Sequence, residues 1–268
     1  MRNQYEQVIG PFPKELMEGA EPFFFPGGAV GCLMVHGLTS HPGEMREFGE
    51  CLAGRGLTVL GIALPGHGTT PEALAKTTWM EWDEAVFRGY QTLAKHSRYV
   101  AAVGSSTGGT LALHLSLNAP LIAVAAMAPP VFDLADPRFR WASWVKYLMK
   151  FSPKKGRSVN NPDVKTALYG YDVNPVASVE QLARCMNHMK TCLREVKVPV
   201  LLWHGERDPV VPISNSERLM VSLGSPQKIF HRLANSSHMI ALDYEKQTVF
   251  DQTHAFILEH AGLAPDPS

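Results

Sequence analysis

The stretch Tyr99–Leu115, YVAAVGSSTGGTLALHL, decides the predicted fold. Its first part is an apolar run typical of a buried strand, and its last part has the composition of a helix. Between them stand two adjacent serines, Ser105 and Ser106, among glycines. The stretch therefore predicts a sharp strand-to-helix turn with a serine at its tip.

Only one of the two serines fits the pattern G-x-S-x-G. Ser106 has Gly104 and Gly108 two residues away on either side, whereas centring on Ser105 would place valine and threonine there. In a nucleophile elbow the serine is lifted above the sheet in a strained conformation, and side chains at the glycine positions would collide. Ser106 is therefore the predicted nucleophile.

Apolar runs that predict buried strands recur along the chain, at residues 29–37, 56–68, 98–105, 121–129, 198–205 and 227–236. Helical patterns occur at 41–56, 78–96 and 107–118, and helical sequence follows each of the last two strands. Repeated strand–helix units with continuously apolar strands favour an α/β fold, with a mostly parallel sheet covered by helices on both faces.

Residues 129–195 interrupt this alternation. They are helical in pattern, with proline-rich joints, and we interpret them as an insertion on top of the sheet within a single domain spanning 1–268. A predicted helix in this segment places four apolar residues on one face: Trp141, Trp144, Leu148 and Phe151. This stripe either anchors the insertion, which we favour, or contacts substrate directly.

Composition excludes several classes of protein. The 25 basic and 25 acidic residues leave no net charge, so no basic field indicates binding to nucleic acid. The N-terminus has no apolar core typical of a secretory signal, and the longest apolar stretch, about 14 residues, is too short for a membrane span. The four cysteines have neither zinc nor disulfide-framework spacing. We expect a soluble, cytoplasmic protein with no stable membrane anchor.

A serine nucleophile needs a base, and the base needs an orienting acid. Asp208 (LLWHGERDPVVP) follows a predicted strand at its carboxyl end, where sites of α/β proteins gather, although it could also simply form the turn before Pro209. Glu206 is its near competitor. Other acidic residues after Ser106 belong to the insertion and follow no strand: Asp133, Asp136, Asp163 and Asp172.

His238 (LANSSHMIALD) is the predicted base among 11 histidines. It lies in a loop after the last predicted strand, later in the chain than Asp208, which gives the order serine, acid, histidine. The other late histidines fall within predicted strands or on the terminal helix: His204, His231, His254 and His260.

Two backbone amides must bind the negative charge that develops on a substrate carbonyl. Thr107 begins the helix after Ser106, where the helix dipole assists, and Leu38 follows Gly37 in the turn after the first strand. We predict that these two residues supply the oxyanion amides. His36 and His67, in neighbouring loops, are interpreted as structural.

Five segments in this order and spacing resemble the α/β-hydrolase superfamily, particularly its bacterial carboxylesterases and monoacylglycerol lipases: HGLTSHPGEM, LPGHGTTPEAL, GSSTGG, HGERDPVVP and NSSHMIALD. The resemblance extends from about Glu21 to Leu263. It implies an α/β-hydrolase fold, a Ser106–His238–Asp208 triad, the two oxyanion amides and a small helical cap in the insertion.

The function expected from this resemblance is hydrolysis of small carboxylic esters with short to medium acyl chains, monoacylglycerols included, through an acyl-enzyme and without cofactor or metal. Relatives often have Met or Gln after the nucleophile, where this chain has Thr107, so we expect a smaller and more polar pocket floor. Two alternatives stay open: the same triad acting on a carbon–carbon bond or thioester, and a non-catalytic binding protein. The sequence makes no prediction of the oligomeric state.

Overall fold

The computed structural model describes residues 8, 15–136, 142–154 and 158–263. Seven strands form one sheet in the order β1-β3-β2-β4-β5-β8-β9. They are β1 (Phe23–Phe25), β2 (Val30–Val35), β3 (Thr58–Ile62), β4 (Tyr99–Ser105), β5 (Ala123–Met127), β8 (Val200–Gly205) and β9 (Lys228–Leu233). Every neighbouring pair is parallel except β1 with β3. The predicted mostly parallel sheet is confirmed.

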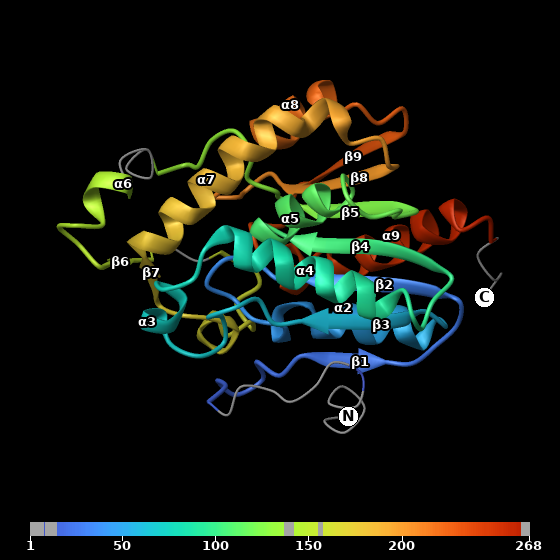
Figure 1. The fold of residues 1–268 in the computed structure, drawn as a ribbon, viewed down its shortest axis with the longest axis horizontal. Coiled ribbons are helices and arrows are strands. Elements are labelled where there is room, and N and C mark those ends of the chain that lie inside the picture. Colours follow the sequence, from blue (N-terminus) through green and yellow to red (C-terminus); the bar gives the residue numbers. More distant parts are fainter. Residues whose placement is uncertain (1–7, 9–14, 137–141, 155–157, 264–268) are drawn as a thin grey trace.

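Helices cover both faces of this sheet (Figure 1). The helices of the described residues are α2 (Gly43–Gly54), α3 (Pro71–Leu74), α4 (Trp79–Leu93), α5 (Thr107–Leu115), α6 (Ala142–Val145), α7 (Val176–Cys192), α8 (Ser214–Ser222) and α9 (Lys246–His260). Short 3-10 turns occupy Thr166–Tyr169, Leu193–Glu195 and Ile240–Leu242. The core is thus divided by the sheet into two apolar layers.

The inner strands contribute side chains to both apolar layers. In β2, β3, β5 and β8 every residue is buried, because helices lie on both sides. On one side Phe48 of α2 stacks on Phe250 of α9, with ring centroids 4.1 Å apart. On the other side Trp82 of α4 is fully buried against the sheet. Helix α4 begins in a capping box, with Thr78 and Glu81 each bonding the other's backbone amide.

Between β5 and β8 the chain forms α6, a two-stranded antiparallel pair, and α7. The pair consists of β6 (Phe151–Pro153) and β7 (Val173–Pro175). Figure 1 shows α6, β6 and β7 beyond the sheet end at which β4 terminates. We propose that this segment, within predicted residues 129–195, is the cap of a single-domain protein.

The predicted apolar stripe in this segment is wrong. Helix α6 ends at Val145, and Trp144 and Leu148 are 74% and 90% exposed instead of anchoring the insertion. Because Phe151 pairs with Pro175 in the β6–β7 ladder, the chain has left helical geometry before the stripe would be complete. Trp141 lies outside the described residues.

Candidate active site

Ser106 connects β4 to α5 at a sharp turn. Its φ of 50° and ψ of −120° lie in a region that non-glycine residues rarely adopt. A Cβ on Gly104 would lie 2.2 Å from the carbonyl oxygen of Gly108, and a Cβ on Gly108 would lie 2.2 Å from that of Val35. Both glycines are therefore needed for the close backbone contacts of this turn, and the sequence pattern centred on Ser106 has a steric cause.

Asp208 lies in the loop after β8, and its side chain is almost fully buried. Oδ1 accepts hydrogen bonds from the backbone amides of Val210 and Val211 at 2.7 and 2.9 Å. Oδ2 lies 2.7 Å from Nδ1 of His238 and 3.4 Å from Nε2 of His204. Burial alone would raise the pKa of Asp208, but the charge of His238 and these hydrogen bonds hold it well below its usual range. Asp208 is thus a preorganised carboxylate.

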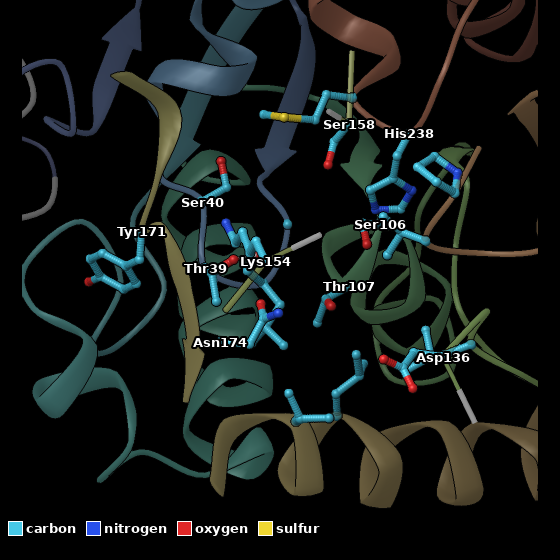
Figure 2. Close-up of a pocket in the computed structure, with 18 of the residues that line it drawn as sticks. Thr39, Ser40, Ser106, Thr107, Asp136, Lys154, Ser158, Tyr171, Asn174 and His238 are labelled. Atoms are coloured by element: carbon cyan, nitrogen blue, oxygen red, sulfur yellow. Dashed lines mark hydrogen bonds between the residues drawn. The ribbon is translucent and has the colours of Figure 1, made fainter. Parts of the chain in front are cut away.

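His238 lies in the loop after β9 and is 8% exposed. Since the Asp208 carboxylate only accepts, Nδ1 of His238 donates to it and Nε2 is left for another partner. Burial lowers the pKa of His238, but the charge and hydrogen bond of Asp208, helped by the charge of Glu44, raise it overall. Figure 2 shows the imidazole next to the Ser106 side chain, and both line the same cavity.

The Leu38 and Thr107 backbones border this cavity as well. Thr107 is the first residue of α5, so its amide has no acceptor within the helix and lies at the positive end of the helix dipole. Leu38 follows Gly37 in the turn after β2. The structure thus brings four of the five predicted site residues to one cavity, and places the fifth, Asp208, buried next to His238.

The cavity has a volume of about 770 Å³, within the range of small-molecule sites. Figure 2 shows a group of polar residues on the opposite side of the cavity from Ser106 and His238, with the Tyr171 hydroxyl directed away, toward Gly66 and Thr69. These are Thr39, Ser40, Lys154, Tyr171 and Asn174. Part of the lining is apolar, with Val179 and Leu182 from α7. Lost hydration lowers the pKa of the partly exposed Lys154 to about 8, opposed by the charges of Glu44 and Asp172.

Sequence reasoning missed Glu44, which is 2% exposed and lies in the first turn of α2. Its Oε1 accepts from the Ser105 hydroxyl at 2.5 Å, and its Oε2 accepts from the Gly37 amide at 3.3 Å. The sequence contains no recognised motif for this contact, because Glu44 and Ser105 lie 61 positions apart. A small polar residue before the predicted nucleophile was the one available signal.

The carboxylate bonded to His238 is that of Asp208, and the competing acids lie at other positions. Glu206 is exposed and its backbone pairs with Leu233. Asp133 pairs with Arg218, and Asp163 is exposed. Two further acids from the insertion line the cavity: Asp136 and Asp172.

The competing histidines have structural contacts. His36 Nε2 accepts from the Leu64 amide at 3.1 Å, which ties two loops together. Burial lowers the pKa of His67 to about 4, and its Nδ1 bonds the Pro65 carbonyl oxygen. His204 bonds the Ser216 hydroxyl and the Val211 carbonyl oxygen, and its Nε2 also lies near Oδ2 of Asp208. The structural interpretation of His36 and His67 agrees with these contacts.

Among the described residues, no group of three His, Cys, Asp or Glu side chains is arranged to hold a metal ion. Within the same described ranges, no helix has the length and apolar character needed to cross a membrane.

Comparison with known proteins places this chain in a family. The family model described as "Serine aminopeptidase, S33" (Hydrolase_4) matches residues 30–245. A thermostable monoacylglycerol lipase of Bacillus sp. (strain H-257) is 34% identical over 247 residues, which are 92% of this chain and 98% of that protein. A carboxylesterase of Bacillus subtilis (strain 168) is 23% identical, covering 88% of this chain and 96% of its own.

Solved structures give the same result. One from work on the metagenome-derived lipolytic enzymes LipS and LipT has a TM-score of 0.87 and 28% identity, covering 92% of this chain and all of its own. The monoacylglycerol lipase of Paleococcus ferrophilus has a TM-score of 0.77 at 20% identity, with coverages of 90% and 98%, which shows the shared fold. The chain belongs to the Hydrolase_4 (serine aminopeptidase S33) family of α/β-hydrolases and is a hydrolase of the esterase and lipase type.

Proposed function

We propose that the protein is a serine carboxylesterase that hydrolyses short- to medium-chain esters, monoacylglycerols included, through a Ser106–His238–Asp208 triad. The observation that supports this most strongly is the buried 2.7 Å hydrogen bond from His238 to Asp208 beside a serine in a strained elbow. A histidine oriented by a buried carboxylate is the arrangement that activates a serine hydroxyl.

In this proposal Ser106 attacks the ester carbonyl while Nε2 of His238 accepts the hydroxyl proton. The tetrahedral oxyanion accepts hydrogen bonds from the Leu38 and Thr107 amides. His238 then protonates the departing alcohol, which leaves an acyl group on Ser106. A water molecule, deprotonated by His238, attacks the acyl-enzyme and releases the acid. Asp208 stabilises the imidazolium in both half-reactions, and its depressed pKa keeps it ionised throughout.

The substrate class rests on the cavity and on the relatives. Both curated relatives are described as ester hydrolases, one of them a monoacylglycerol lipase. Thr107, where relatives often have Met or Gln, and the polar residues opposite make part of the lining polar, which favours a small polar alcohol group and disfavours a long acyl chain. Direct binding of a small-molecule ester needs no nucleic acid, cofactor or metal, and we propose none.

A rate comparison tests this proposal. We expect hydrolysis of p-nitrophenyl esters to be fastest for acyl chains of two to eight carbons, to fall at sixteen, and to be lost in Ser106→Ala. Monoacylglycerol of matching chain length should also be hydrolysed. A thioester, a vinylogous 1,5-diketone and a p-nitroanilide serve as further substrates. Faster turnover of any of these than of every ester would contradict the carboxylesterase assignment, and no turnover at all would favour a binding protein.

A further inference from the structure

The buried carboxylate of Glu44 joins the two halves of the site. Ser105, which donates to Oε1, directly precedes the proposed nucleophile, and Gly37, which donates to Oε2, directly precedes the Leu38 amide. We propose that Glu44 is a positioning residue that fixes the oxyanion turn against the nucleophile elbow through these two hydrogen bonds. The inference rests on the proposed ester hydrolysis and extends it to a residue outside the triad.

The space between turn and elbow explains why such a link matters. A Cβ on Gly37 would lie 3.3 Å from the Ser106 Cβ and 3.6 Å from Glu44 Oε2, so turn, elbow and carboxylate are already in contact. Within the turn, the Ser40 amide bonds the Gly37 carbonyl oxygen at 3.2 Å, and Thr39 has a φ of 61°. Its far side is tied to the cap segment, where the Tyr171 amide donates to the Thr39 carbonyl oxygen at 3.0 Å. A strained turn depends on external contacts for its position, and Glu44 supplies the side-chain contact that links this turn to the elbow.

The position of Glu44 is itself fixed. It lies in the first turn of α2, where the helix dipole favours a carboxylate, and its amide bonds the carbonyl oxygen of His41 at 3.0 Å. A charge that is 2% exposed is costly unless donors surround it. The hydroxyl of Ser105 and the amide of Gly37 are such donors, so nucleophile strand, oxyanion turn and helix are joined at one carboxylate.

The charge of Glu44 also reaches the base. It raises the pKa of His238, in the same direction as Asp208 and against Lys154. The charge of Glu44 also acts to raise the pKa values of Lys154 and His41. Removing this charge should therefore lower the pKa of His238, an effect that a purely structural contact would not produce.

Three variants and one control test the inference on a p-nitrophenyl ester that the wild-type protein hydrolyses. Glu44→Gln removes the charge and can retain only one of the two acceptor contacts, so kcat should fall about 10- to 100-fold with KM within about threefold. Its acid limb in the pH–rate profile should move to lower pH. Ser105→Ala keeps the charge, so kcat should fall less and the limb should not move. The double variant should be no slower than Glu44→Gln, because the pair acts as a unit.

Glu47→Gln is the matched control, since Glu47 lies on the same helix, is exposed and pairs with Lys246. It should have wild-type kcat. The inference is overturned if folded Glu44→Gln retains wild-type kcat and pH profile, if its loss lies wholly in KM, or if the double variant shows additive losses. If Glu44→Gln does not fold, wild-type kcat in Ser105→Ala overturns it. Failure of the proposed function appears instead in the wild-type protein, as absence of hydrolysis.

Discussion

Replacement of Asp208 by asparagine tests its proposed role in orienting His238 as the base. The Val210 and Val211 amides donate to Oδ1 at 2.7 and 2.9 Å, so an asparagine would keep its carbonyl oxygen there. Its NH2 group would then occupy the place of Oδ2 and donate to Nδ1 of His238. Nδ1 would become an acceptor, and the proton would move to Nε2, the atom that accepts the proton of Ser106 in the proposed mechanism. The variant is nearly isosteric with the wild type but holds the imidazole in the wrong tautomer.

The expected loss is large because two effects act together. The wrong tautomer removes the base, and the missing carboxylate no longer stabilises the imidazolium whose pKa it raises in the wild type. Comparable changes in serine hydrolases lower kcat by about 10³- to 10⁴-fold, or about 4 to 5 kcal/mol of transition-state stabilisation.

Steady-state hydrolysis of a p-nitrophenyl ester measures this loss, and the rate of fluorophosphonate labelling measures it without any dependence on substrate preference. Both should fall together, whereas KM should change little. Thermal unfolding provides the control, because the backbone contacts of Oδ1 are kept and the variant should remain folded. A folded Asp208→Asn protein with kcat within tenfold of the wild type would refute the proposed role of Asp208.

Three further predictions follow from the geometry. Thr107 Oγ1 is buried without a hydrogen-bond partner, so Thr107→Val should raise the free energy of unfolding by about 1 kcal/mol and keep activity within several-fold; a destabilised variant in denaturant titration would contradict this. Gly104→Ala should lower that free energy by about 3 kcal/mol because of the 2.2 Å contact with Gly108, whereas Gly54→Ala, with no atom within 4 Å, should be tolerated; equal effects would contradict it. Since His238 must be neutral to accept a proton and its pKa is raised, kcat/KM should decline with falling pH through a midpoint above 6.5; a midpoint below 6.5 would contradict it.

Local pattern was sufficient for most of the sheet. Every predicted strand contains a strand of the structure, since continuous apolar runs have few other solutions in a protein of this size. Their ends were less well predicted: the run at 56–68 contains β3 only as Thr58–Ile62. Strand β1 was missed because three phenylalanines, Phe23–Phe25, pair antiparallel at a sheet edge and no periodicity distinguishes so short a run.

The cap could not be predicted in the same way. Its β6–β7 pair joins residues 20 or more positions apart, including Pro153 and Pro175, and proline is a poor indicator of strands. The helical spacing of apolar residues predicted that Trp144 is buried, but it is exposed. Such spacing shows which residues share a helix face and does not show whether another element packs against that face. Chain order and strand ends identified Ser106, Asp208 and His238 as neighbours, but the Glu44 link depends on a tertiary contact that spacing does not encode.

The central claim is that Ser106, and not its neighbour Ser105, is the nucleophile. Incubation with a fluorophosphonate followed by peptide mapping in a mass spectrometer tests it directly. The account predicts one adduct, on Ser106, absent from Ser106→Ala and still formed, more slowly, by Ser105→Ala. An adduct on Ser105, or labelling that persists in folded Ser106→Ala, would contradict it.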